Sequence, residues 1–359
     1  LMCGIVGAIT ERDVTPLLIE GLRRLEYRGY DSAGIAVIEN GSIKRIRRTG
    51  KVKELNLALE KEPLSGVTGI AHTRWATHGA PSEKNAHPHH STDDLAIVHN
   101  GIIENFEELK NQLQSSGYVF ESETDTEVVA HLIHQHLNES NDLLNAVQKS
   151  VADLEGAYAL VVMSKENPDT LVAARSGCPV VLGLGVKENF VASDVSALLP
   201  VTKNFIFLDE NDVAVIQRKN IAIYDVDGND VERPVKETSL ASDAAERGDY
   251  RHFMQKEIHE QARAVADTIS QRIANGKVLD AAFGPKANEI FDQIKAIHIT
   301  ACGTSYHAGL VAKYWIEQFC QIPCSVEIAS EYRYRSPVIL DKTLFISISQ
   351  SGETADTLA

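Results

Sequence analysis

The chain has 359 residues, and 35 Lys and Arg against 50 Asp and Glu give it a net charge of −15 at pH 7. Its length favours two domains, and a hydrophobic content of 43% excludes a chain that is disordered throughout. The negative charge argues against nucleic-acid or anionic-membrane binding, because phosphates would be repelled. No apolar run approaches the ~18 residues of a membrane helix, and no secretory signal opens the chain. We therefore expect a cytoplasmic globular protein.

Up to about residue 235, short strands alternate with a few helices. A helix is predicted from 13 to 29, because Pro16 suits a first turn and leucines follow at helical spacing. Asn40-Gly41 predicts a hairpin, since both residues tolerate positive φ. The further predicted strands are 34–39, 42–47, 67–72, 95–99, 158–164, 170–174, 180–184 and 205–216, and the further helices are 105–115 and 126–137. This interleaving indicates antiparallel sheets covered by helices.

The pattern changes after a polar segment without periodicity, 233–249, which we interpret as a linker. A helix is expected over 252–274. Three strands separated by helix-length stretches then predict a parallel α/β sheet, at 296–300, 325–328 and 344–349. Because the chain stops at Ala359, where a further helix should begin, we expect this α/β domain to be truncated. The domains are thus expected at 3–240 and, with the linker included, at 241–359.

Cys3 follows Met2 directly and precedes an apolar, strand-like run. By itself it is either a small buried hydrophobic side chain, as most free cysteines are, or a nucleophile. If Leu1 and Met2 are removed, the α-amine of Cys3, with a pKa of about 7.7–8.0, can serve as general base for the thiol of the same residue. If they stay attached, that amine is lost.

Three polar segments follow predicted strands or open a predicted helix. Arg74 follows one strand and offers a guanidinium that can hold a carboxylate by two hydrogen bonds. Asn100 and Gly101 follow another strand, where a side-chain amide beside a glycine N–H supplies two donors aimed at one point, as an oxyanion hole requires. Asp125 lies at a helix start, where capping alone is also a sufficient explanation.

Histidines occur in two groups, within 87–90 and within 131–136. A metal site is the alternative to consider for both. Neither group has an acidic or cysteine ligand at a usual spacing, and the second does not share one helix face. We therefore expect no metal.

Six segments, in order, resemble the class II glutamine amidotransferase family: Cys3–Gly7, Glu26–Gly34, His72–Gly79, Asn85–His89, His99–Gly101 and Glu123–Glu127. The resemblance covers about the first 240 residues. It implies the α+β fold of the N-terminal-nucleophile hydrolases, a four-layer αββα sandwich. It implies that Cys3 is the nucleophile and that Asn100 and the Gly101 N–H stabilise the oxyanion. It implies that Arg74 binds the carboxylate of glutamine and that Asp125 binds its α-ammonium. It also implies that Trp75 belongs to a loop that closes over glutamine, and that Thr77 and His78 line the pocket.

Two turns in the second part follow strands and open helices, at 301–305 and 350–354. Hydroxyls and N–H groups at a helix N-terminus form an anion site, although capping alone also explains each turn. No lysine follows the glycine, so neither turn is a Walker P-loop. The turns resemble those of the sugar isomerase (SIS) domain family. That resemblance implies that a sugar phosphate contacts Thr304, Ser305, Ser349, Gln350, Ser351 and Thr354.

Together the two resemblances imply a homodimeric aminotransferase that needs no cofactor. It would hydrolyse L-glutamine and transfer the ammonia to fructose 6-phosphate, forming glutamate and glucosamine 6-phosphate for amino-sugar nucleotide synthesis. Because a second SIS half has no counterpart here, we expect this chain to retain only the glutaminase half. Two alternatives stay open. One is another class II amidotransferase, such as a phosphoribosyl-diphosphate amidotransferase, although we find no acidic diphosphate-binding loop. The other is a sugar-phosphate sensing module, although no DNA-binding motif is evident.

Overall fold

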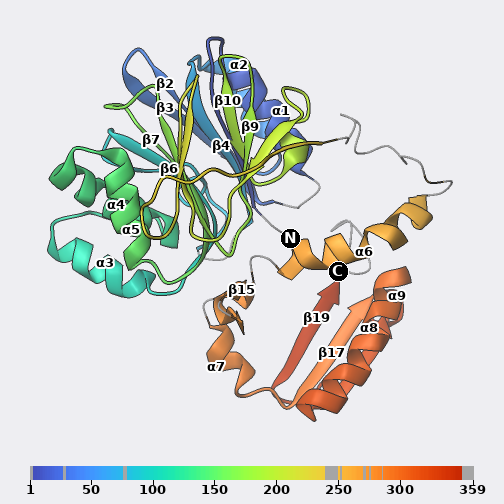
Figure 1. Cartoon of the computed structure of the whole chain (residues 1–359). Helices are drawn as coiled ribbons and strands as arrows, with labels where there is room; N and C mark the ends of the chain where they lie inside the picture. The colour runs from blue at the N-terminus through green and yellow to red at the C-terminus, as the bar shows by residue number, and fades with distance from the viewer. Residues whose placement is uncertain are drawn as a thin grey trace. The chain divides into compact units, whose positions relative to one another are not determined.

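The computed structural model describes residues 3–26, 30–75, 79–238, 250, 253–269, 272–274, 276–284 and 286–349 (Figure 1). By their internal contacts the residues form two units, Leu1–Gly284 and Pro285–Ala359, and each is described by itself. The domain boundary expected at residue 240 stays a prediction. Within the ranges described, no helix is both long enough and apolar enough to cross a membrane.

Two antiparallel sheets form the middle of the first unit. The first sheet has the order β14-β11-β9-β10-β1-β4-β2-β3. Its strands are β1 Gly4–Ile9, β2 Ser32–Glu39, β3 Ser42–Thr49, β4 Thr68–Arg74, β9 Val181–Leu184, β10 Asn189–Ala192, β11 Asn204–Phe207 and β14 Val235–Glu237. The second sheet has the order β13-β12-β8-β7-β6-β5. Its strands are β5 His89–Ser91, β6 Leu95–Ile103, β7 Gly156–Ser164, β8 Leu171–Ser176, β12 Val213–Ile216 and β13 Ile221–Tyr224.

Strand β1 shows why the sheets stack, since successive side chains on a strand point to opposite faces. Ile5 and Ile9 belong to the apolar core between the two sheets, whereas Val6 and Ala8 belong to the core on the outer face of the first sheet. A strand that is buried on both faces must be covered by a layer on each side. The sandwich satisfies this requirement without leaving the apolar faces in water.

Helices cover both outer faces of the pair of sheets (Figure 1). The first sheet is covered by α1 (Thr15–Leu25) and α2 (Val52–Lys61). The second is covered by α4 (Asp125–Ser140) and α5 (Leu143–Asp153), and α3 (Phe106–Ser115) packs against α4. The four layers confirm the predicted αββα sandwich, and the hairpin at Asn40-Gly41 is also confirmed.

Three sequence expectations were wrong in this unit. The strand expected at 205–216 is two strands in different sheets, β11 and β12, because the polar turn between them redirects the chain. The helix expected at 252–274 is α6 (Phe253–Ile269), and a small hairpin of β15 (Ile273–Ala274) and β16 (Lys277–Val278) follows it. The expected linker begins with β14, which pairs with β11.

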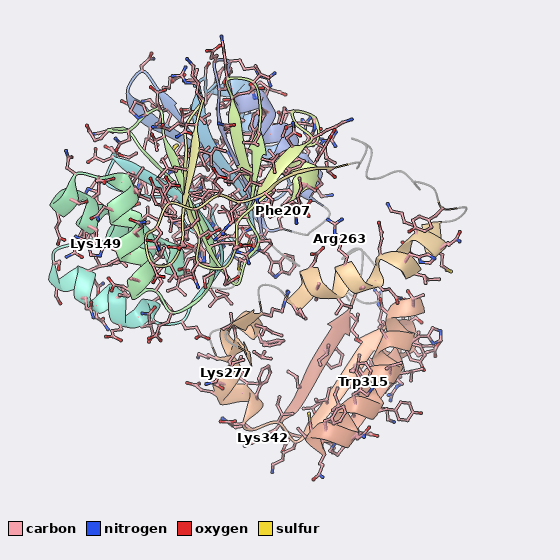
Figure 2. The ribbon with its side chains drawn as sticks, in the orientation of Figure 1. Lys149, Phe207, Arg263, Lys277, Trp315 and Lys342 are labelled. Carbon is pink, nitrogen blue, oxygen red and sulfur yellow. The ribbon has the colours of Figure 1, made fainter. Side chains whose placement is uncertain are left out.

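The second unit contains a three-stranded sheet with the order β18-β17-β19. Both pairings are parallel, as predicted. Its elements are α7 Ala287–Phe291, β17 Ala296–Ala301, α8 Gly303–Trp315, the π-helix η4 Ile316–Cys320, β18 Cys324–Ile328, α9 Ala329–Arg333 and β19 Thr343–Ile348. Gly309 allows α8 to pack closely on Ile299 and Val326 of the sheet. Trp315, labelled in Figure 2, ends α8 with 60% of its surface exposed.

Candidate active site

Strand ends from both sheets meet at one recess in the first unit. Cys3 immediately precedes β1, and β4, which pairs with β1, ends at Arg74. The second sheet contributes Asn100 and Gly101 near the end of β6, and Asp125 begins α4. The recess encloses about 10 Å³, roughly the space of one water molecule. It is lined by Cys3, Arg74, Trp75, His87, His99, Gly101, Thr124, Asp125 and Thr126.

The Cys3 thiol is partly buried beside the backbone of Trp75. The Trp75 N–H donates a hydrogen bond to the Cys3 Sγ at 3.1 Å. Burial raises the pKa of the thiol to about 11, although the Trp75 N–H and the positive charge of Arg74 oppose the change. The carboxylates of Asp31 and Asp125 raise this pKa further. The thiol therefore needs a base before it can act as a nucleophile at neutral pH.

Asn100 is fully buried on β6 of the second sheet and contacts two residues on the side of the first sheet, Cys3 and His72. Its Nδ2 donates to the carbonyl oxygen of Cys3 at 3.2 Å, and its Oδ1 lies 2.9 Å from Nε2 of His72. Gly101 follows with a φ of +123°, a conformation that L side chains rarely adopt. A Cβ at this position would overlap the carbonyl oxygen of Ala157. Only glycine fits, so the backbone of this residue borders the recess without a side chain.

Arg74 and Asp125 place opposite charges in the wall of the recess. Only 2% of Arg74 is exposed; its Nη1 lies 3.6 Å from Oδ1 of Asp31, and its Nη2 donates to the carbonyl oxygen of Gly79 at 3.2 Å. Asp125 is 4% exposed, and its Oδ2 accepts from the Ile103 N–H at 2.9 Å. A buried cation and a buried anion beside one thiol suit a zwitterionic ligand.

Three buried histidines lie at the recess or beside it: His87 and His99 line it, and the ring of His89 contacts that of His87. His87 and His89 belong to a group that the sequence analysis considered as metal ligands. Nε2 of His87 and Nδ1 of His99 each lie 2.8 Å from the hydroxyl of Thr126. Nε2 of His89 lies 3.0 Å from the hydroxyl of Thr124. Burial holds the pKa of His87 and of His89 well below the usual value, so both rings are neutral. Among the residues that the structure describes, no three His, Cys, Asp or Glu side chains are grouped to hold a metal.

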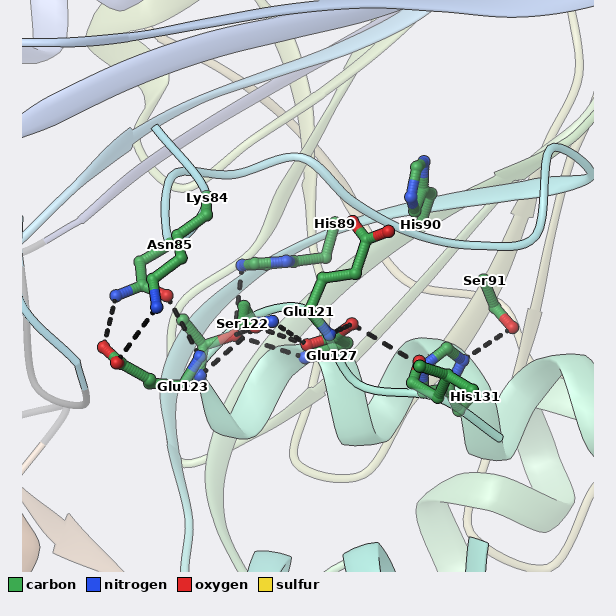
Figure 3. A network of polar contacts seen from close by, with 12 residues as sticks. Lys84, Asn85, His89, His90, Ser91, Glu121, Ser122, Glu123, Glu127 and His131 are labelled. Carbon is green, nitrogen blue, oxygen red and sulfur yellow. Dashed lines mark hydrogen bonds and ion pairs between the residues drawn. The ribbon is translucent and has the colours of Figure 1, made fainter. Parts of the chain in front are cut away.

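A second polar network fixes the start of α4 (Figure 3). Glu127 accepts from the N–H groups of Glu121 and Ser122 at 2.8 and 2.7 Å, and one of its oxygens lies 3.7 Å from Nε2 of His131. Burial opposes ionisation of Glu127, but the contact with His131 and the hydrogen bonds from Glu121 and Ser122 hold its pKa below the usual value. Nearby, Asn85 donates to Glu123 at 2.9 Å. These contacts join the loop before β5 to the helix that carries Asp125.

The predicted glutamine-binding residues are only partly covered by the structure. Trp75 borders the recess and is 39% exposed. Thr77 and His78 lie outside the described residues, as do Leu1 and Met2. Asp31, His87, His99 and Thr126 were not assigned a role in the sequence analysis. All four lie inside the motifs that were recognised, which was the signal available for them.

The predicted sugar-phosphate residues lie in the second unit. Thr304 and Ser305 are in the first turn of α8, exposed and partly buried respectively, and the partly buried Ser349 follows β19. The parallel register sets Ala301 opposite Ile348, so both segments leave the sheet at the same edge. Gln350, Ser351 and Thr354 lie outside the residues that the structure covers.

Comparisons with known proteins agree with both resemblances. Residues 72–200 match the family model of the glutamine amidotransferase domain, and residues 290–359 match that of the SIS domain. The chain is 59% identical over 358 residues to the glutamine–fructose-6-phosphate aminotransferase (isomerizing) of Shewanella oneidensis. It is 56% identical over 359 residues to the enzyme of that name from Escherichia coli K12. Both matches cover 100% of this chain and 59% of the relative, so the chain spans about three fifths of these relatives.

Two solved structures share the fold. The allosteric regulatory enzyme of purine biosynthesis has a TM-score of 0.56 at 26% identity, over 63% of this chain and 50% of that one. A glutamine phosphoribosylpyrophosphate amidotransferase from B. subtilis has a TM-score of 0.58 at 20% identity, over 94% of this chain and 69% of that one. Both likenesses agree with the N-terminal-nucleophile sandwich built by the two sheets. The chain therefore carries a match to the glutamine amidotransferase domain followed by a match to the SIS domain, and it is similar along its whole length to glutamine–fructose-6-phosphate aminotransferases.

Proposed function

We propose that the chain hydrolyses L-glutamine at Cys3, releasing glutamate and ammonia. The observation that carries the proposal is a convergence of side chains in one recess. A thiol, a glycine backbone, a buried guanidinium and a buried carboxylate line it, and the amide of Asn100 lies next to it, hydrogen-bonded to the carbonyl oxygen of Cys3. Each of these groups has a distinct task in the hydrolysis of a carboxamide that carries an α-amino acid head group.

The chemistry begins with the proton of the thiol. When Cys3 is the first residue, its α-amine takes that proton, and the thiolate attacks the carboxamide carbon. Nδ2 of Asn100 and the N–H of Gly101 stabilise the negative oxygen of the tetrahedral intermediate. The protonated α-amine then returns its proton to the leaving nitrogen, and ammonia departs from a thioester. Water, activated by the same amine, hydrolyses the thioester and releases glutamate, which restores the thiol.

The charged wall would select and orient the substrate. Arg74 binds the α-carboxylate of glutamine and Asp125 binds its α-ammonium, while Asp31 holds the guanidinium in place. By the family resemblance, Trp75 belongs to a loop that closes over glutamine, and Thr77 and His78 line the pocket.

We further propose that the ammonia is transferred to fructose 6-phosphate, forming glucosamine 6-phosphate. The proposal is supported by relatives that are 56–59% identical along the whole chain and are named glutamine–fructose-6-phosphate aminotransferases (isomerizing). The phosphate would bind at the sheet edge in the second unit, through Thr304, Ser305, Ser349, Gln350, Ser351 and Thr354. We propose a homodimer in the cytoplasm. The likeness at 20% identity to a phosphoribosylpyrophosphate amidotransferase supports the fold alone, so that alternative is less favoured.

The test starts from protein whose first residue is Cys3, verified by intact mass. Glutamate release from glutamine is measured for this protein, for a form that retains Met2, and for Cys3→Ala. The proposal expects turnover only in the first. Turnover in Cys3→Ala would refute the nucleophile. Hexosamine formation with fructose 6-phosphate is followed separately, so that the two reactions are scored independently.

A further inference from the structure

One buried contact joins the two sheets next to Cys3. His72 lies on β4 of the first sheet and Asn100 on β6 of the second, and neither side chain is exposed. Their Nε2 and Oδ1 atoms are 2.9 Å apart. Neither the capture of glutamine nor the proton transfers proposed above uses His72.

The hydrogen-bond directions follow from the chemistry of the atoms. The carbonyl oxygen of Cys3 only accepts hydrogen bonds, so the atom of Asn100 that lies 3.2 Å from it must be the amide nitrogen. The amide oxygen then faces His72. Because an amide oxygen also only accepts, the imidazole must donate from Nε2. The neutral ring therefore has its proton on Nε2 and a lone pair on Nδ1.

The surroundings of His72 favour this neutral tautomer. Its Nδ1 is buried, and within the described residues it has no hydrogen-bond partner. The ring of His87 lies 4.1 Å away between centroids. Burial, together with Coulombic repulsion from His99 and Arg74, lowers the pKa of His72 to about 3, although the hydrogen bond to Asn100 and an interaction with the backbone of His99 oppose this change. The ring thus stays a neutral donor at neutral pH.

We propose that His72 is a positioning residue that orients the amide of Asn100 for glutamine hydrolysis. The Nε2–H of His72 holds Oδ1, and this fixes Nδ2 on the side of Cys3, where the oxyanion forms. An amide that rotated by half a turn would direct an oxygen toward that negative charge and would oppose the reaction. The inference rests on the proposed function, because it assumes that Asn100 is an oxyanion donor.

The experiment is a double-mutant cycle on glutamine hydrolysis. The variants are His72→Leu, which removes the donor, Asn100→Ala, and the double variant. His72→Gln keeps a donor near the Nε2 position and is the matched rescue variant. His136→Gln, on α4 beside Asp153, controls for the loss of a histidine elsewhere. Turnover number and Michaelis constant are measured for each variant, together with its thermal midpoint.

We expect His72→Leu to lower kcat about 10- to 100-fold, because a misdirected donor loses much of the effect of an oxyanion contact, and to change KM less than about 3-fold. In the Asn100→Ala background the same change should lower kcat by less than about 3-fold. His72→Gln should recover most of the loss. An equal loss in both backgrounds, or a rise in KM in place of the fall in kcat, would overturn the inference.

A spectroscopic measurement separates this inference from the proposed function. Nitrogen-15 NMR of the histidine rings should show His72 neutral and protonated on Nε2 from pH 5 to pH 8. A ring protonated on Nδ1, or a cationic ring at pH 5, would overturn the inference whatever the activity. If Asn100→Ala hydrolyses glutamine as fast as the unaltered protein, the oxyanion assignment fails, and the role of His72 fails with it. If His72→Leu does not fold, the NMR result decides.

Discussion

The candidate glutaminase site in the first unit and the candidate sugar-phosphate site in the second differ in how their side chains are held in place. In the first unit the polar side chains are buried and hydrogen-bonded or ion-paired to neighbouring residues: Arg74 is 2% exposed, Asn100 is fully buried, and Asp125 is 4% exposed. In the second unit Thr304 is exposed, and the site is set mainly by the backbone where two parallel strands end. A buried, hydrogen-bonded network is aligned before the substrate arrives. Exposed hydroxyls at the end of a sheet lose their rotational freedom only when the ligand binds. Substitutions of the reacting groups Cys3 and Asn100 should therefore change the chemical step, whereas substitutions in the second site should change affinity.

The largest effect is expected for Cys3→Ala. The change removes one sulfur from a partly buried position, so the sandwich should keep its stability within about 1 kcal/mol. Glutamine hydrolysis should fall to the background rate. Activity assay and thermal unfolding of the same sample check both parts of the expectation. Residual turnover above one hundredth of the original would exclude Cys3 as the nucleophile.

Asn100→Ala comes next. An oxyanion donor acts mainly in the transition state, so kcat should fall roughly 10²- to 10³-fold with little change in KM. Steady-state kinetics of glutamate release measure both constants. Asn100→Asp is the matched control, since it keeps the size of the side chain but replaces the donor with a negative oxygen. The assignment fails if the aspartate variant is as active as the unaltered protein.

Arg74→Ala should act on binding. The guanidinium contacts the substrate carboxylate in the ground state and in the transition state, so KM should rise about 10- to 100-fold while kcat changes less. Arg74→Lys retains the charge but loses the forked geometry, and it should give an intermediate KM. A fall in kcat at unchanged KM would contradict the role of carboxylate ligand.

The smallest effect is expected in the second unit. Thr304→Ala removes an exposed hydroxyl at the start of α8, so stability should change by less than about 0.5 kcal/mol. Affinity for fructose 6-phosphate, measured by calorimetry, should fall about 3- to 10-fold, which corresponds to the net contribution of one ordinary hydrogen bond. Thr304→Ser keeps the hydroxyl and should bind nearly as well as the unaltered chain. Equal affinity in Thr304→Ala would remove this residue from the proposed site.

Much of the fold and site could be predicted because the relevant signals are local. Asn40-Gly41 indicates its own hairpin, and Asn100-Gly101 carries two neighbouring donors in one dipeptide. The break inside 205–216 could not be predicted from apolar content, because the chain changes sheet at a polar turn whose bonds depend on tertiary partners. The bond from His72 to Asn100 was also hidden, since the two strands belong to different sheets.

The central claim is that Cys3 attacks the carboxamide of glutamine. Protein that begins at Cys3 can be incubated with a glutamine analogue whose carboxamide is replaced by a diazoketone, and the modified residue can be mapped by peptide mass spectrometry. All five cysteines are free, so Cys178, Cys302, Cys320 and Cys324 serve as internal controls. We expect one adduct per chain, on Cys3, and we expect excess glutamine to prevent it. Modification of another residue in its place, or an unmodified Cys3 in protein that hydrolyses glutamine, would contradict the account.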